Sequence, residues 1–477
     1  MQANRTFLFI ILVLTLLSFV SIFFPEEGIA VSGQKLYFLT MDDIASDSSS
    51  NQETDALVRV QAIEESLRQD SIYTDSLAAF VRFFDEHPSR ISLPQNNYHY
   101  FDSLFQALET CEALQKNIHI LHYGDSQIEG DRITSSIRQN LQAKFGGNGP
   151  GLLPAVQTIP SAVVGQTVSK NMVHYIISGS FKNKAPHNRY GVLGQVDISA
   201  GENSISIFSR NLKDTFNNVK EFQTVRLFTG RAKNFKARFN TRNESPQVEI
   251  EEQPPLKIFS WQLKKPAKQC TFRLSGAGEI YGISLEGLSG VSVDNIPFRG
   301  SSGTFFSSMD STVISTLYKE LNVKLILLEF GGNVMPVIRD TAAIMHYQKQ
   351  IVKQIRYLKK LQPDACILLI GPADMSKKVR GKLQTYPFLE EVIGALKAAA
   401  LENDAAFWNM YEVMGGHNSM IDWVKSAPKL AAPDYIHFTN KGAERIAHLF
   451  YESLMVYYNY YCFEKEHRID QQQNATE

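Results

Sequence analysis

The sequence predicts an α/β protein in which a doubly wound parallel sheet carries an inserted all-β, jelly-roll-like module and is preceded by an N-terminal membrane segment. Three observations predict this class. Near-continuous apolar runs alternate with helix-like segments in the last third of the chain. Short alternating runs fill the stretch that separates the first apolar strand from the others. An uncharged apolar segment stands close to the N-terminus.

The N-terminal apolar segment spans residues 7–24, FLFIILVLTLLSFVSIFF, and carries no charge. Arg5 precedes it and two glutamates follow it, which predicts a cytoplasmic N-terminus and an exported remainder. The segment is long enough to cross a bilayer as a signal anchor, but residues 28–30, Gly-Ile-Ala, could also end a cleaved signal peptide. We expect the protein on the periplasmic side of the inner membrane, anchored there, or free in the periplasm if the segment is cleaved.

The lead-in to the folded part begins with residues 40–60, which are acidic and Ser-rich and predict a spacer from the membrane. Residues 61–90 have weak helical periodicity, and residues 101–115, FDSLFQALETCEALQ, predict an amphipathic helix. The apolar run NIHILHY at 117–123 then predicts the first strand.

The pattern changes at residues 155–288, where short alternating runs such as SISIFSR, TVRLFTG and CTFRLSG predict an all-β sandwich or jelly roll. From residue 290 onward the runs GVSVDNIPF, VKLILLEF and ACILLIG predict parallel strands covered on both faces. The helix-like segment 341–361 lies between two of them. Because the strand at 117–123 fits this parallel sheet, the β module reads as an insertion into the α/β domain.

The predicted organisation therefore has parts of distinct character. They are residues 1–30, the signal anchor or signal peptide; 31–95, a polar spacer and helical lead-in; 96–154, the first part of the α/β domain; 155–288, the inserted β-sandwich; 289–465, the second part of the α/β domain; and 466–477, a polar tail.

The composition excludes some classes of protein. The net charge is −1 and basic residues are scattered, whereas a nucleic-acid-binding protein needs a basic footprint, so we expect no nucleic-acid partner. The 4 cysteines are spread over the chain without CxxC spacing, which argues against a zinc ribbon or a disulfide-dense scaffold. With 44% hydrophobic residues the chain can bury a large core.

Small and polar residues follow the predicted strands, and in an open parallel sheet functional groups gather at the carboxyl ends of strands. Each pattern alone also fits an ordinary turn or helix cap. Together they supply what acyl transfer needs, a nucleophile, a base, a group that orients the base, and oxyanion donors. The patterns are GDS ending at Ser126, FRGSSG containing Gly300, EFGGN ending at Asn333, and DYIH with Asp434 and His437.

The predicted roles follow from chemistry. Ser126 is the nucleophile, and His437 takes its proton and later delivers it to the leaving alcohol. Asp434 holds the other ring nitrogen. The oxyanion donors are the backbone N–H of Ser126, the N–H of Gly300 and the side-chain amide of Asn333. This chemistry requires no cofactor and no metal, and its rate should fall at low pH as His437 becomes protonated.

The order of these motifs resembles the SGNH (GDSL-type) hydrolases, whose motif blocks supply Ser, Gly, Asn and His. Gly300 matches the second block, with Gly303 close enough to compete, and block one reads GDSQ instead of GDSL, a departure that changes no catalytic atom. The segments HYGDSQIEGDRIT, MGGHNSMIDW and DYIHFTNKGA are similar to the bacterial peptidoglycan O-acetylesterase branch, in which a carbohydrate-binding-like β-sandwich is inserted between the first two blocks. The resemblance implies a serine esterase that removes O-acyl groups, foremost O-acetyl, from a carbohydrate, with peptidoglycan as the leading substrate.

Alternative readings remain open. The same triad would make a carbohydrate O-acetyltransferase if a sugar hydroxyl outcompeted water, and a protein with an inert hydrolase domain would be a glycan-binding surface protein. A metal site is disfavoured because no HxH or HExxH pair is present. We expect His122 to be a core residue and His417 a solvated loop residue. The sequence indicates no particular protein partner.

Two groups of aromatic residues are expected to be structural. The Tyr-rich end YESLMVYYNYYCFEKE predicts a terminal helix that packs its apolar face on the sheet. Aromatic residues on the strands of the β module are core residues more often than sugar-binding platforms. They are Phe208, Phe222, Phe228 and Trp261.

Overall fold

The computed structural model describes most of the chain. The described residues are 55–73, 76–210, 221–241, 247–252, 256–379 and 381–474, two short paired strands, β1 (Ile29–Val31) and β2 (Gln34–Leu36), and scattered positions between 6 and 20. Half of the predicted membrane segment 7–24 and all of residues 40–54 of the predicted spacer thus lie outside the described residues. In the part of the chain that is described, no helix is long and apolar enough to cross a membrane.

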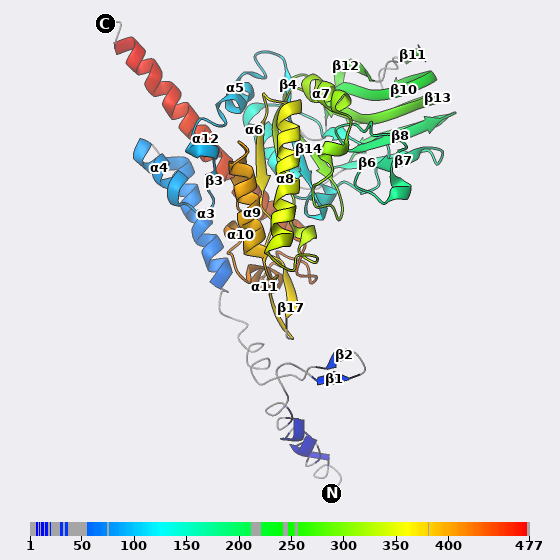
Figure 1. Cartoon of the computed structure of the whole chain (residues 1–477). Coiled ribbons are helices and arrows are strands. Elements are labelled where there is room, and N and C mark those ends of the chain that lie inside the picture. Colours follow the sequence, from blue (N-terminus) through cyan, green and yellow to red (C-terminus); the bar gives the residue numbers. More distant parts are fainter. Residues whose placement is uncertain are drawn as a thin grey trace.

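The centre of the molecule is a 6-stranded sheet that the predicted apolar runs build (Figure 1). Its neighbouring strands are parallel except at one edge, where β3 runs antiparallel to β19. This confirms the predicted parallel sheet. In spatial order the strands are β14 (Gly290–Pro297), β4 (Asn117–Gly124), β15 (Val323–Glu329), β16 (Cys366–Ile370), β19 (Ala406–Trp408) and β3 (Ile91–Ser92).

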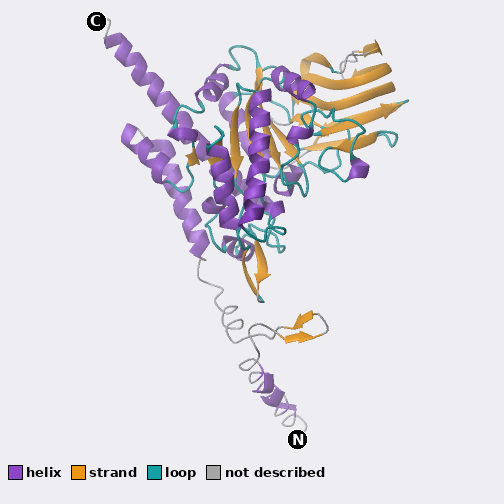
Figure 2. Cartoon of the chain, in the orientation of Figure 1, coloured by secondary structure: helices purple, strands orange, loops and turns teal. Residues whose placement is uncertain are grey.

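Helices cover both faces of this sheet, as Figure 2 shows. In β4, Ile118 and Ile120 join one apolar cluster while Leu121 and Tyr123 join the other, because successive side chains point to opposite faces of a sheet. The helices are α5 (Asp102–Thr110), α6 (Thr134–Phe145), α7 (Ser311–Glu320), α8 (Thr341–Leu361), α9 (Leu389–Leu401), α10 (Met410–Val413), α11 (Ser419–Lys425) and α12 (Asn440–Asn474).

The lead-in differs from the prediction at its start. Helix α3 (Asp55–Tyr73) begins inside the segment that was predicted to be a spacer, and α4 (Leu77–Glu86) follows it. The reason is one apolar stripe at helical spacing, which is buried against the main core. Arg445 of α12 also binds Glu64 of α3 with two contacts of 2.6 Å. The stripe consists of Val60, Ile63 and Leu67.

The Tyr-rich C-terminal segment forms the long helix α12 and buries one face on the core, as predicted. The predicted polar tail from residue 466 continues this helix to Asn474. The buried face includes Leu454, Met455, Val456, Tyr457 and Tyr460.

The stretch predicted to be all-β forms a 9-stranded antiparallel sheet, seen beside the helix-covered sheet in Figures 1 and 2. Strand β5 belongs to it although it precedes the predicted boundary at 155, because it pairs with Ile283–Leu285 of β13. The strands are β5 (Gly151–Leu153), β6 (Val164–Val168), β7 (Val173–Ile176), β8 (Gln195–Ala200), β9 (Asn203–Ser209), β10 (Phe222–Asn240), β11 (Gln247–Glu252), β12 (Lys257–Ala267) and β13 (Gln269–Glu286).

The aromatic residues of the β module are mostly core, as expected. Phe222 and Phe228 are buried and Trp261 packs against the core of the module. Phe208 differs, because it is 43% exposed and its ring lies over Gly165, where a Cβ atom would be 2.3 Å away.

A buried ionic network joins the β module to the parallel sheet. His119 of β4 contacts Asp294 of β14 at 2.6 Å and Glu286 of β13 at 3.3 Å, and Arg226 of β10 binds Glu286. Burial alone would lower the pKa of His119, but the two carboxylates raise it to about 9, so the imidazole is protonated. Asp294 also accepts the N–H of Leu152. The network therefore joins strand β5, at the start of the module, to β4 and β14 of the parallel sheet.

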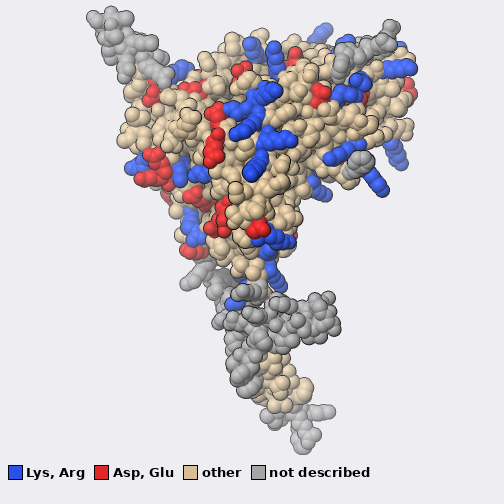
Figure 3. Space-filling view, viewed as in Figure 1, with Lys and Arg blue, Asp and Glu red and all other residues tan. Residues whose placement is uncertain are grey.

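The surface carries charges of both signs. On the face shown in Figure 3, Lys and Arg side chains are interspersed with Asp and Glu side chains.

Candidate active site

The residues predicted to be functional meet at one edge of the sheet. Ser126 opens a short 3₁₀ turn (Ser126–Asp131) directly after β4, and Gly300 follows β14. Asn333 lies in the turn after β15, and His437 lies in the loop before α12. The carboxyl ends of parallel strands share one edge of a sheet, so residues distant in sequence become neighbours. Together with residues of the β module these four line an open cavity of about 760 Å³.

Ser126, His437 and Asp434 form a continuous chain of hydrogen bonds. Ser126 Oγ is 2.8 Å from His437 Nε2, and His437 Nδ1 is 2.8 Å from Asp434 Oδ2. Asp434 Oδ1 accepts the backbone N–H groups of Ile436 and His437 at 2.9 and 3.0 Å. Burial raises the pKa of Asp434, but these hydrogen bonds outweigh it and hold that pKa below its usual range. An ionised Asp434 can therefore orient the ring so that Nε2 accepts the serine proton.

The turn before Ser126 depends on its two preceding residues. A Cβ atom at Gly124 would lie 3.0 Å from the side chain of Ile128, so the turn packs closely on itself. Asp125 caps the turn, because its Oδ1 accepts the N–H of Gln127 at 3.0 Å. Gly124 and Asp125 thus present Ser126 at the strand end, as the motif predicts.

The sequence offers two glycines, Gly300 and Gly303, as the second oxyanion donor, and the structure places them in different surroundings. Gly300 lines the cavity, has a positive φ of 71°, and its N–H makes no hydrogen bond to another described residue. The N–H of Gly303 donates to Ser301 Oγ at 3.1 Å, and Gly303 does not line the cavity. This geometry favours Gly300.

Asn333 lines the same cavity, but its amide already has partners. Its Nδ2 donates to Asp125 Oδ2 at 2.7 Å and to the carbonyl oxygen of Ser301 at 3.2 Å. Donation from Asn333 to an oxyanion therefore competes with these two bonds. Asp125 is itself buried, and burial raises its pKa to about 7 despite the hydrogen bonds from Gln127 and Asn333.

The structure adds two residues that hold the site together and that the sequence reasoning missed. Gln127 Nε2 donates to the carbonyl oxygen of Ile436, and Arg132 donates to the carbonyl oxygens of Ser126 and Phe438 at 2.7 and 2.9 Å. Both side chains join the serine turn to the histidine loop. The available signal was the GDSQ motif, in which a polar side chain takes the place of the family's leucine.

The β module also contributes to the site. Residues 159–162, which precede β6, line the cavity, and the N–H of Ala162 donates to the carbonyl oxygen of Gly130 at 2.9 Å. Beside them Arg299 binds Glu129 with two contacts of 2.6 Å. Nothing in the local pattern of residues 159–162 indicates this placement.

The remaining candidate residues lie apart from the cavity. His122 is fully buried and contacts Glu329 at 3.0 Å and Thr134 at 2.9 Å, so it is the core residue that was predicted. The His417 side chain is 62% exposed, lies 3.5 Å from Glu390 and does not line the cavity. Among the described residues, no group of His, Cys, Asp and Glu is placed to hold a metal ion.

Comparison with solved structures gives matches that include a peptidoglycan O-acetylesterase over most of the chain. The structure of a peptidoglycan O-acetylesterase aligns over 76% of this chain and 97% of its own, with a TM-score of 0.61 and 21% sequence identity. A family two carbohydrate esterase from Cellvibrio japonicus aligns over 62% of this chain and 99% of its own, with a TM-score of 0.25 and 9% sequence identity. This TM-score indicates only a weak likeness. No protein-family model and no curated protein matches the sequence. The resemblance expected from the motifs is thus confirmed at the level of the fold.

Proposed function

We propose that this chain is a serine esterase that removes O-acyl groups, foremost O-acetyl, from a carbohydrate, with peptidoglycan as the leading substrate. The hydrogen-bonded chain of Ser126, His437 and Asp434 at an open cavity carries this proposal. The fold shared with a peptidoglycan O-acetylesterase supports the choice of substrate.

The proposed mechanism has two halves. Ser126 Oγ attacks the ester carbonyl carbon while His437 Nε2 takes the hydroxyl proton, and Asp434 stabilises the resulting imidazolium. The N–H of Gly300 donates to the oxyanion. Collapse of the tetrahedral intermediate breaks the bond to the sugar oxygen, which takes the proton from His437 and leaves an acyl-Ser126. A water molecule, deprotonated by His437, then attacks the acyl carbon. The bond to Ser126 Oγ breaks, Oγ takes the proton from His437, and the carboxylic acid is released.

Transfer of the acyl group to a sugar hydroxyl is the competing outcome. The side chains of His437 and Asp434 are 31% and 47% exposed, so solvent reaches the groups that would activate water. This exposure favours hydrolysis over an O-acetyltransferase, which needs to exclude water from its acyl-enzyme.

We further propose that the enzyme acts outside the cytoplasm, on the periplasmic side of the inner membrane. The uncharged segment 7–24 with Arg5 before it and acidic residues after it supports this location. A reporter enzyme that is active only in the periplasm, fused after residue 40, tests this location. An active fusion would support export, and an inactive fusion would contradict it.

The test of the activity uses the wild type, Ser126→Ala and a control, Ser311→Ala, which changes an exposed serine at the start of α7. Each is mixed with O-acetylated peptidoglycan, and released acetate is measured with and without a sugar acceptor. We expect acetate release by the wild type and the control only, unaffected by the acceptor. Acetate diverted into acetylated acceptor would favour the transferase. Release that survives in Ser126→Ala would refute the triad, and no release by the wild type would favour a glycan-binding protein.

A further inference from the structure

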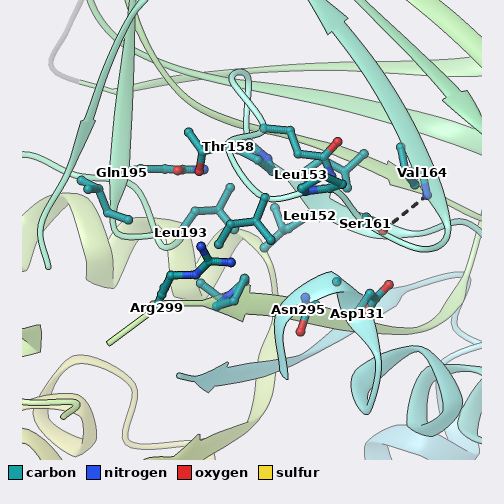
Figure 4. A pocket seen from close by; sticks show the side chains of 18 of the residues that line it. Asp131, Leu152, Leu153, Thr158, Ser161, Val164, Leu193, Gln195, Asn295 and Arg299 are labelled. Atoms are coloured by element: carbon teal, nitrogen blue, oxygen red, sulfur yellow. Dashed lines mark hydrogen bonds between the residues drawn. The ribbon is translucent and has the colours of Figure 1, made fainter. Parts of the chain in front are cut away.

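A second cavity of about 340 Å³ lies beside the first, between the β module and the end of β14 (Figure 4). The two cavities share lining residues, so only a narrow strip of the protein separates them. This strip comes from the serine turn, the loop before β6 and the residues after β14. Its members are Gly130, Ile159, Pro160, Ser161 and Arg299.

One side of this cavity is apolar. Leu152 and Leu153 of β5 contribute to it, together with Leu193 and Ile296, and all of these side chains are buried. Figure 4 shows Leu152 and Leu193 side by side in the cavity wall. Such a surface gains free energy when an apolar group of a ligand covers it.

The cavity wall also contains two side-chain amides whose hydrogen-bonding groups are not all used by the described residues. Gln195 is 8% exposed and lines the cavity, yet its side-chain amide makes no hydrogen bond to another described residue. Asn295 accepts a hydrogen bond from Thr134 on its Oδ1, and its Nδ2 has no partner among the described residues. Neither side-chain amide is among the buried polar groups without a partner, so both reach the cavity, where a ligand with matching groups can pair with them.

The wall that borders the active-site cavity is built by its own hydrogen bonds. Gln166 accepts the N–H of Gln157 at 2.8 Å and donates to the carbonyl oxygen of Pro154 at 2.8 Å. Ser161 Oγ accepts the N–H groups of Val163 and Val164, the latter drawn as a dashed line in Figure 4. The cavity is therefore formed before any ligand arrives, as small-molecule sites usually are.

The charged residues of the wall are already paired. Asp131 binds Arg138 with contacts of 2.7 and 3.1 Å, and Arg299 binds Glu129. A neutral ligand therefore fits better than an ionic one, because it does not compete with these pairs.

We infer that this cavity binds an N-acetylated amino sugar, the neighbour of the sugar whose ester is cleaved at Ser126. The methyl group of an acetamido substituent would cover the leucines, and its N–H and C=O would pair with Gln195 and Asn295. The volume lies at the lower end of the ~300–1,000 Å³ usual for ligand sites, which suits one sugar ring. The inference rests on the proposed function and gives that function its substrate class.

The experiment measures binding to the full-length protein by calorimetry. The probes are the trimer of N-acetylglucosamine and the trimer of glucose, which is also neutral but has hydroxyl groups in place of the acetamido groups. Neither carries an O-acetyl ester, so binding is read without turnover. We expect the wild type to bind the N-acetylated trimer at least tenfold more tightly than the glucose trimer.

Three variants locate the binding. Gln195→Ala should weaken binding of the N-acetylated trimer about tenfold, because the hydrogen bonds between Gln195 and the sugar are lost. Thr158→Trp, a change at an exposed rim residue, should block the cavity and abolish binding. Gln269→Ala changes an exposed glutamine that begins β13 and does not line the cavity, and this variant should bind like the wild type. Melting temperatures show that each variant is folded.

The outcomes separate this inference from the proposed function. Equal affinity for the two trimers, no binding by the wild type, or wild-type affinity in Gln195→Ala and Thr158→Trp would each overturn the inference, even if acetate release stays dependent on Ser126. Binding that depends on Gln195 in a protein that releases no acetate would support the sugar site and reject the esterase.

Discussion

The side-chain amide of Gln127 donates a hydrogen bond to the carbonyl oxygen of Ile436 over 2.6 Å, although 309 residues separate the two. The same side chain accepts the N–H of Phe438 at 3.3 Å. Gln127 therefore holds both neighbours of His437 from the turn that carries Ser126. Its side chain therefore fixes Ser126 and His437 relative to each other.

Replacing Gln127 with leucine, which restores the GDSL motif and removes both bonds, should lower kcat about thirtyfold. Each lost hydrogen bond contributes roughly 1 kcal/mol, and 1.36 kcal/mol in the barrier is a factor of ten. The measurement is steady-state hydrolysis of p-nitrophenyl acetate and of O-acetylated peptidoglycan. Gln106→Leu, at an exposed position of α5, is the matched control. An unchanged kcat in Gln127→Leu would show that the histidine loop is held by Arg132 alone.

Asp434→Asn should lower kcat by roughly 10³–10⁴ with little change in stability. The side-chain oxygen would keep the backbone N–H bonds of residues 436 and 437, so the new NH₂ group would face His437 Nδ1. The ring would then carry its proton on Nε2, where it cannot accept the proton of Ser126. Single-turnover kinetics and the melting temperature test this, with the exposed Asp364→Asn as control. A loss of less than tenfold would mean that Asp434 does not set the tautomer.

Gly300→Ala and Gly303→Ala should fail in different ways. At Gly300 a Cβ atom would meet nothing within 4 Å, but the φ of 71° strains an alanine, and relief of that strain would move the backbone N–H of this cavity-lining residue. We expect a fall in kcat of about 10²–10³ at a nearly normal melting temperature. At Gly303 the Cβ atom would lie 2.6 Å from the Phe330 ring, so the main effect should be a lower melting temperature. The reverse pattern would assign the oxyanion N–H to Gly303.

Asp125→Asn should change how stability depends on pH. Burial raises the pKa of Asp125 to about 7, above the ~3.9 of an unfolded aspartate. Between those values the folded protein holds a proton that the unfolded chain releases, so this residue lowers stability as pH rises from about 4 to about 7. The variant should melt close to the wild type at pH 5 and a few degrees above it at pH 8.

Melting curves at the two pH values make the comparison. Burial also raises the pKa of Asp374, to about 6, so this residue too lowers stability as pH rises. Asp374 is unchanged in the variant, and some pH dependence of stability should therefore remain. Asp364→Asn, at an exposed position, should follow the wild type at both values. A variant that melts below the wild type at pH 8 would show that the bond to Asn333 needs the carboxylate.

The sequence by itself determined the framework of this protein. Apolar runs of strand length, with a helical segment whose bounds 341–361 the structure reproduces, specify a parallel sheet because their periodicity is local. The small and polar residues at the ends of those runs placed Ser126, Gly300 and Asn333 at one edge. The Asp434–His437 pair followed from spacing within one loop.

Only the tertiary structure decided what surrounds that triad. The bond between Gln127 and Ile436, the loop 159–162 over the site, the amides of Gln195 and Asn295 in a second cavity, and the start of α3 at Asp55 all depend on which distant segments pack together. A polar residue has the same local pattern whether it faces solvent or a partner hundreds of residues away. Burial and pairing arise only when the chain closes on itself, so the sequence can mark an unusual residue such as Gln127 in GDSQ but cannot name its partner.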